Sequence, residues 1–259
     1  MEIFWNLECM VDMKTIWSAE AASKAYIDTV RSLHTLAFHR SSDVAEFISA
    51  LAAGSDARLI VEAWAPGAGA ATSVGLAVAT ACTGGRHVCV VPDERLRLEY
   101  ADAASEAGVS PEVVVGEAED AMEALSGVDF MVVDGRRRDT VGLLRFARIS
   151  SGGAILVCTH ASGERSWSDF AWRGLVGSGT RVLRSTFLPV GEGVEIVQLG
   201  FKGGSASTAG SRWINLVDHG IGSVSIGSSK PNAFVANASS VTVSLLKIHI
   251  AFATRIKIS

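Results

Sequence analysis

Residues 58–69 read Arg-Leu-Ile-Val-Glu-Ala-Trp-Ala-Pro-Gly-Ala-Gly, an apolar run that leads into a glycine-containing turn. The run is continuous rather than alternating, which is typical of a strand buried on both faces of a parallel sheet. Similar runs occupy residues 87–91, 113–115, 130–134 and 154–158. Helical stretches are expected between these runs, at residues 72–81, 95–107, 119–125 and 140–148. This alternation predicts an α/β fold with a parallel sheet and right-handed crossovers.

The segments on either side of this core complete the predicted layout. Two β-rich runs, 181–188 and 194–199, flank residues 189–193 and predict an antiparallel hairpin after the fifth strand. Upstream, Ser18 is a candidate N-cap for a first helix, and a second helix is expected over residues 42–53. A Rossmann-like, mostly parallel sheet closed by such a hairpin, with helices on both faces, is the layout of class I methyltransferases.

The two ends of the chain differ from its middle in composition. We expect residues 1–12 to be an extension and residues 13–218 to form one domain, with a flexible Gly/Ser linker at 203–211. After Asp218 no Asp or Glu occurs, while Lys230, Lys247, Arg255 and Lys257 do. Residues 219–259 are therefore expected to form an atypical, poorly integrated tail. A sheet-edge strand or a basic membrane-surface segment are the alternatives for this tail.

Bulk composition restricts the class of protein. With 259 residues, 48% of them hydrophobic, the chain can bury a full core as one domain. A net charge of −4 argues against a nucleic-acid partner, and residues 136–138, three arginines, are expected in a solvated loop. Neither a secretory signal nor a membrane span is visible, and the four cysteines lack metal or disulfide spacing. We expect a cytoplasmic protein with a small-molecule partner, no membrane partner and, as an open alternative, a homodimer.

Five stretches resemble a plant family of unknown function. They are residues 13–30 (Met-Lys-Thr-Ile-Trp-Ser-Ala-Glu-Ala-Ala-Ser-Lys-Ala-Tyr-Ile-Asp-Thr-Val), 58–62, 71–76, 128–130 with Asp134, and 212–214 followed by 217–218. Its members are described as S-adenosylmethionine-dependent methyltransferase-like, and the resemblance covers about Met13 to Asp218. More distantly, Arg58 to Leu199 is similar to catechol-type class I O-methyltransferases. The resemblance implies S-adenosylmethionine as the cofactor.

The cofactor-binding residues implied by this resemblance lie at the carboxyl ends of the first three strands. The first group follows strand one and comprises Glu62, Ala63, Trp64, Gly67, Gly69 and Thr72. Glycines let the backbone approach a ligand closely, but Trp64 stands where a glycine is usual and the loop is about two residues longer. A tight turn without a ligand is the alternative.

After strand two, the acid that binds the ribose hydroxyls is replaced by Val91, so Asp93 or Glu94 would have to substitute. Each is better explained as an acid at a helix N-terminus. After strand three, Glu117 resembles the acid that reaches the adenine amino group, or is a surface carboxylate that opens the next helix.

The catalytic candidates follow strands four and five. Asp134 matches the first magnesium ligand of catechol-type enzymes, but Thr159 and His160 replace the Asp-Asn pair that completes such a site. One carboxylate is a poor magnesium site, so no metal is expected. His160 is instead a candidate general base, since the pKa of imidazole lies near working pH, although a single loop histidine is also compatible with a surface role.

Three functions remain open at this point. The first is a metal-independent, S-adenosylmethionine-dependent methyltransferase acting on a small molecule. The second is a catalytically inactive binding protein that keeps the fold, which Trp64 and Val91 favour. A nicotinamide-dependent oxidoreductase ranks third, because the hairpin and the missing acid do not suit it.

Overall fold

The computed structural model describes residues 17–36, 42–161 and 179–201. The chain divides into two compact units, Met1–Gly203 and Gly204–Ser259, and all of the described residues belong to the first. The expected extension at 1–12, the linker and the tail at 219–259 lie outside the described residues.

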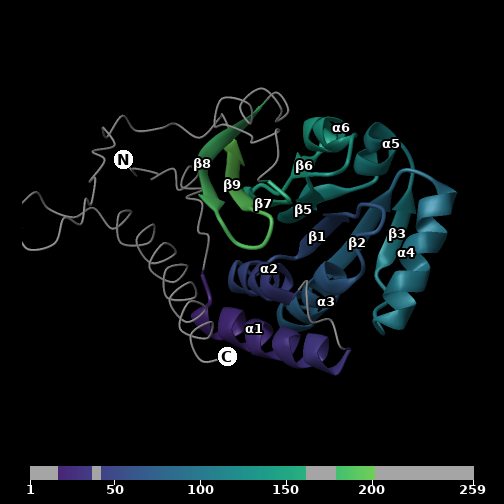
Figure 1. The fold of residues 1–259 in the computed structure, drawn as a ribbon. Helices are drawn as coiled ribbons and strands as arrows, with labels where there is room; N and C mark the ends of the chain where they lie inside the picture. Colours follow the sequence, from purple (N-terminus) through teal and green to yellow (C-terminus); the bar gives the residue numbers. More distant parts are fainter. Residues whose placement is uncertain (1–16, 37–41, 162–178, 202–259) are drawn as a thin grey trace, which may run out of the picture. The chain divides into compact units, whose positions relative to one another are not determined.

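A seven-stranded sheet forms the centre of the described part of the chain, in the order β3-β2-β1-β5-β7-β9-β8 (Figure 1). The strands are β1 (Leu59–Ala63), β2 (Arg86–Val91), β3 (Glu112–Val115), β5 (Phe130–Asp134), β7 (Ala154–Thr159), β8 (Thr180–Leu188) and β9 (Val194–Phe201). The first five of these pair in parallel, whereas β9 pairs antiparallel with both β7 and β8. This arrangement confirms the predicted class I methyltransferase layout.

Helices cover both faces of the sheet, as expected. They are α1 (Ala19–Thr35), α2 (Ser42–Gly54), α3 (Ala71–Thr83), α4 (Glu94–Glu106), α5 (Ala118–Glu123) and α6 (Thr140–Phe146). In Figure 1, α1, α2 and α3 lie on one side of the sheet, and α5 and α6 on the other. No helix within the described residues is long and apolar enough to cross a membrane.

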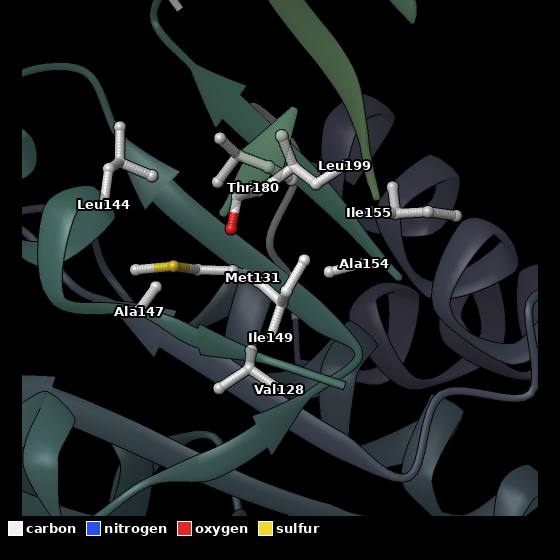
Figure 2. A pocket seen from close by; sticks show the side chains of 10 residues that line it. Val128, Met131, Leu144, Ala147, Ile149, Ala154, Ile155, Thr180 and Leu199 are labelled. Carbon is white, nitrogen blue, oxygen red and sulfur yellow. The ribbon is translucent and has the colours of Figure 1, made fainter. Parts of the chain in front are cut away.

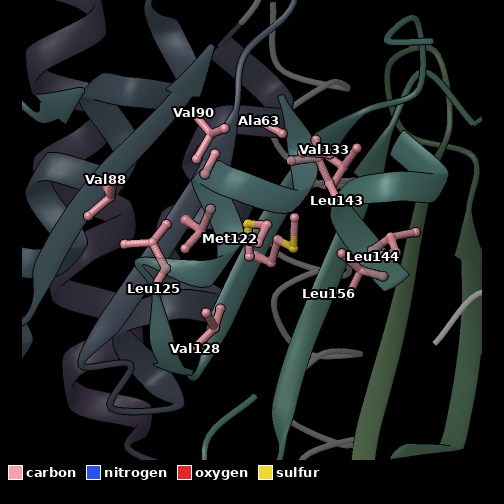
Figure 3. Close-up of a cluster of buried hydrophobic side chains, with 14 of the residues drawn as sticks. Ala63, Val88, Val90, Met122, Leu125, Val128, Val133, Leu143, Leu144 and Leu156 are labelled. Carbon is pink, nitrogen blue, oxygen red and sulfur yellow. The ribbon is translucent and has the colours of Figure 1, made fainter. Parts of the chain in front are cut away.

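The sheet has a buried apolar cluster on each of its two faces, because side chains alternate along each strand. Val61, Ala63, Val88 and Val90 face α5 and α6 and join the cluster of Figure 3. Cys89 and Val91 face the opposite way, toward α4. Side chains of neighbouring strand residues point to opposite faces, so the two clusters show that β2 is covered on both sides, and every residue of β1 is buried as well.

The helix ends follow their capping chemistry. Ser18 Oγ accepts a hydrogen bond from the Ala21 N–H at 3.1 Å, which confirms the predicted cap of α1. Gly84 ends α3 with φ 67°, a left-handed conformation that costs glycine little.

Two expectations about local structure were wrong. The helix expected over 140–148 ends at Phe146, because Ala147 has an extended ψ of 122° and Arg148–Ile149 forms β6. Strand β6 pairs in parallel with β4 (Ser126–Val128) in a separate small sheet. Strand β3 is not buried on both faces: it lies at the edge of the sheet, where Glu112 and Val115 are exposed.

Candidate functional site

The strand order places a topological switch point between β1 and β5. The pocket of Figure 2 lies elsewhere, near the amino-terminal ends of β5 and β7, where Val128, Met131 and Ala154 line it. From β1 the chain proceeds outward through β2 to β3, then returns to β5 on the other side of β1. In open α/β sheets, ligands bind outside the carboxyl ends of the strands at such a switch point. The turns after β1, β5 and β7 meet at this edge, and they carry most of the predicted site residues.

The turn between β1 and α3 has an open surface. Gly67 and Gly69 have φ values of 71° and 68°, and a Cβ added at either position would meet no atom within 4 Å. Helix α3 begins at Ala71 without a side-chain cap, so the N–H groups of its first turn are directed toward this edge. Thr72 lies half-buried in that turn. This exposed turn and the adjoining first turn of α3 are called the cradle below, because N–H groups at a helix N-terminus suit an anionic or zwitterionic group.

Trp64 lies beneath this turn. Its side chain is almost fully buried, its Nε1–H donates to the Gly69 carbonyl oxygen at 2.7 Å, and its ring meets that of Tyr100 edge-on at 5.4 Å. The indole belongs to the apolar cluster with Val91 and Leu96 on the α4 side of the sheet. It therefore supports the turn from below and leaves the space in front of Gly67 and Gly69 open.

Glu62 is held in a buried hydrogen-bond cluster. Its carboxylate accepts from Ser73 Oγ at 2.8 and 3.0 Å and from Tyr100 Oη at 3.2 Å, and it lies 3.0 Å from His87 Nε2. Burial, together with this carboxylate, raises the pKa of Tyr100 above its usual range. The Glu62 side chain thus connects β1 to β2, α3 and α4, and its carboxylate is not free to bind a cofactor.

The cluster around Glu62 was missed by the sequence reasoning. Ser73, His87 and Tyr100 lie 11 to 38 positions from Glu62 along the chain. The only available signal was polar residues inside otherwise apolar runs. Ala63, also predicted at the site, points its side chain into the core on the α5–α6 face, so only its backbone can face a ligand.

The acids expected around the rest of the cofactor are arranged less favourably. Val91 is fully buried at the end of β2. Asp93 Oδ1 accepts from the Leu96 N–H at 2.8 Å and caps α4, which matches the structural alternative for this residue. Glu117 occupies the N-cap position of α5, exposed and without a side-chain capping bond.

Arg137 connects the ends of two strands. Its Nη1 donates to the carbonyl oxygens of Trp64 and Val90 at 2.9 and 2.7 Å, and its Nε donates to Asp139 Oδ1 at 2.8 Å. Burial alone would raise the pKa of Asp139, but the Arg137 guanidinium lowers it below its usual range. The expectation of a solvated loop is wrong for Arg137, which is 5% exposed, because its guanidinium fills the gap between β1 and β2.

Asp134, Arg136 and His160 form a polar cluster at the ends of β5 and β7. Asp134 accepts from the Arg136 backbone N–H and Nε, both at 2.9 Å, and from Nη2 at 2.6 Å. His160 Nδ1 lies 3.3 Å from Asp134 Oδ1, and Nε2 lies 3.7 Å from a Glu192 carboxylate oxygen. Burial would raise the pKa of Asp134, but hydrogen bonds from His160 and Arg136 together hold it well below its usual range.

His160 also has a strained backbone. Its φ of 55° lies in the left-handed region, which is uncommon for a residue other than glycine. Strain of this kind costs about 1–3 kcal/mol and concentrates at functional sites. The observation therefore favours a role for His160 beyond that of a surface loop residue.

The magnesium site implied by the catechol-type resemblance does not fit these residues. Both oxygens of Asp134 already accept hydrogen bonds from Arg136, so the guanidinium occupies the coordination positions of the carboxylate. Thr159 and His160 add no second anionic ligand. Within the described residues, no three His, Cys, Asp or Glu side chains are grouped to hold a metal ion.

Comparison with known proteins identifies the family. The family model described as "Protein of unknown function (DUF1442)" matches residues 13–226. The chain belongs to the DUF1442 family. Among curated proteins, none matches this DUF1442 chain.

Solved structures similar to the DUF1442 chain include three methyltransferases. A methyltransferase from Geobacter sulfurreducens is 18% identical, with 66% of this chain and 88% of that one covered and a TM-score of 0.47. The Podospora anserina methyltransferase PaMTH1, solved with S-adenosylhomocysteine bound, is 17% identical, with 71% of this chain and 88% of that one covered and a TM-score of 0.46. The O-methyltransferase TomG of Streptomyces achromogenes, involved in tomaymycin synthesis and solved with S-adenosylmethionine, is 20% identical. The match covers 68% of this chain and 90% of that one, with a TM-score of 0.45. The fold assignment rests on the strand order of the chain itself.

Proposed function

We propose that this DUF1442 protein is an S-adenosylmethionine-dependent methyltransferase that acts on a small molecule without a metal ion. The observation that carries the proposal is the open cradle in front of Gly67 and Gly69, which lies at the switch point of the sheet.

The residues of the cradle suit the amino-acid half of the cofactor. The backbone of Ala63, Gly67 and Gly69 and the first turn of α3, with Thr72, would hold its carboxylate and amine. Glu117 is exposed after β3 and would reach the adenine amino group. When bound, S-adenosylmethionine supplies an electrophilic methyl group, and transfer then depends mainly on alignment with a nucleophile.

His160 is the proposed general base, and Asp134 is its positioning partner. The Asp134 carboxylate beside Nδ1 favours the tautomer in which Nδ1 carries the proton. The exposed Glu192 carboxylate lies 3.7 Å from Nε2, so a substrate hydroxyl would replace it there before giving its proton to Nε2. Because the pKa of Asp134 is lowered, this carboxylate stays ionised at neutral pH and stabilises the imidazolium that forms.

The donor set supports the metal independence of the proposed reaction. Arg136 already balances the charge of Asp134, so proton removal by His160 replaces activation of the hydroxyl by a Lewis acid. Activity should therefore persist in the presence of a chelator such as EDTA.

A pair of glycine variants tests the cradle. Gly69→Ala places a methyl group in the proposed cofactor space, whereas Gly108→Ala introduces the same change at an exposed glycine after α4. Gly108 has a φ of 66° and equally open surroundings, so both variants incur a similar strain of about 1–2 kcal/mol. Calorimetric titration with S-adenosylhomocysteine should show reduced affinity only for Gly69→Ala. No binding to the wild-type chain, or an equal loss in both variants, would refute the proposal.

An inactive binding protein is the second candidate function. It is favoured by the buried Val91 at the end of β2 and by the use of Asp93 as a helix cap, because both remove the acid expected at the ribose. Binding of S-adenosylhomocysteine without methyl transfer to any member of a library of hydroxylated metabolites would favour this alternative over the enzyme.

A further inference from the structure

We infer that Arg136 binds a carboxylate of the substrate, so that the substrate class is a hydroxylated carboxylic acid. The catalytic part of this inference rests on the proposed methyltransferase function, but binding of the carboxylate does not.

The Arg136 guanidinium has N–H donors that Asp134 does not use. Arg136 contacts Asp134 through Nε and Nη2, which uses one edge of the planar group. A guanidinium has five N–H donors, so the two of Nη1 and the second of Nη2 lie on the other edges. An arginine held in this way can bind a second carboxylate with a fork of parallel hydrogen bonds.

Arg136 is accessible to a ligand although Asp134 holds it in place. The Arg136 side chain is 45% exposed, whereas the Asp134 side chain that fixes it is 9% exposed. The buried carboxylate therefore restricts the rotamers of the arginine while its outer edge remains available to solvent. Preorganisation of this kind lowers the entropy lost when a ligand binds.

The proposed base, His160, lies beside Arg136. Arg136 Nε and His160 Nδ1 both lie within hydrogen-bonding reach of the same atom, Asp134 Oδ1. The guanidinium and the imidazole are thus neighbours, and the exposed Glu192 carboxylate lies near both, 3.7 Å from His160 Nε2. In the proposed reaction, the ligand whose carboxylate meets Arg136 would also carry the hydroxyl from which His160 removes a proton.

Two small probes that differ in one group test this recognition. 3-Hydroxybenzoate carries a hydroxyl and a carboxylate, and 3-hydroxybenzamide replaces the carboxylate with a neutral amide of similar shape. Calorimetric titrations without cofactor should show about tenfold tighter binding of the acid to the wild-type chain, as expected for charge-assisted hydrogen bonds.

Arginine variants then assign the preference to one side chain. Arg136→Gln should bind both probes equally, and Arg136→Lys should keep only part of the preference because lysine lacks the fork. Arg138→Gln removes an exposed arginine two residues away and should leave the preference unchanged. If Arg136→Gln fails to fold, Asp134→Asn combined with Arg136→Gln removes the orphaned carboxylate and provides the same comparison.

The outcomes separate this inference from the proposed function. No preference for the acid, or a preference that survives Arg136→Gln, overturns the inference. A chain that prefers the acid but does not bind S-adenosylhomocysteine supports the role of Arg136 and overturns the methyltransferase proposal.

Discussion

Substitutions of Trp64 distinguish two interpretations of the site: either the indole supports the turn after β1, or it blocks the space in front of that turn. Replacing Trp64 with Phe removes the hydrogen bond from Nε1 to Gly69 and part of the buried ring that packs against Tyr100. The lost hydrogen bond costs about 1 kcal/mol, and the smaller ring adds about 1 kcal/mol of lost packing. We expect the free energy of unfolding, measured by urea titration with circular dichroism, to fall by about 2 kcal/mol. The affinity for S-adenosylhomocysteine should also fall, because the turn loses its support.

Trp17→Phe is the matched control for this change. The Nε1 atom of Trp17 is buried and makes no hydrogen bond to the described residues, and its ring packs against Gly54 at the end of α2. This variant should lose less stability and keep the wild-type affinity. A third variant, Trp64→Ala, separates the two interpretations. If it binds S-adenosylhomocysteine more tightly than the wild type does, the indole blocks the space in front of the turn, which contradicts a supporting role.

Three further predictions concern the packing and electrostatics of the fold. Gly75→Ala should lower the free energy of unfolding, measured in urea, by about 2 kcal/mol, because the new Cβ would lie 2.6 Å from the Ala45 carbonyl oxygen. Helix propensity alone predicts a neutral or stabilising effect, and that result would contradict this packing of α3 on α2. Because the pKa of Asp134 is lower in the folded chain than in the unfolded one, its ionised carboxylate stabilises the fold above about pH 4, and this stabilisation is lost as the pH falls further. The difference in the free energy of unfolding between wild type and Asp134→Asn should therefore shrink in acid. A difference that grows in acid would exclude the proposed charge pairing. Burial raises the pKa of Cys158 to about 12 and that of Cys89 well above its usual range, so a maleimide should label both only after unfolding, as followed by mass spectrometry; rapid labelling in buffer would show that the core opens there.

The sequence was sufficient to predict most of the sheet. Central strands such as β1 and β5 are buried on both faces, which requires continuous apolar runs, and those runs could be located to within one residue. The same rule failed for β3, because a sequence run does not reveal that its strand will lie at an edge. It also failed at the end of α6, where Ala147 and Arg148 are good helix formers but tertiary pairing with β4 extends the backbone.

The site was less predictable because its contacts join residues far apart in the chain. The direction of the Trp64 indole depends on Tyr100, 36 positions away, and no local pattern encodes it. Within the arginine run, Arg137 turns inward to carbonyl groups 73 and 47 positions away, whereas Arg136 remains partly exposed. A run of like charges indicates solvation on average, but it does not show which member fills a gap between strands.

A crystal structure of the chain with S-adenosylhomocysteine tests the central claim most directly. We expect the amino-acid end of the ligand in front of Gly67 and Gly69, against the first turn of α3, with its sulfur facing His160. A ligand bound elsewhere, or a crystal grown at saturating ligand in which the turn after β1 binds nothing, would contradict the claim that this edge of the sheet holds a cofactor.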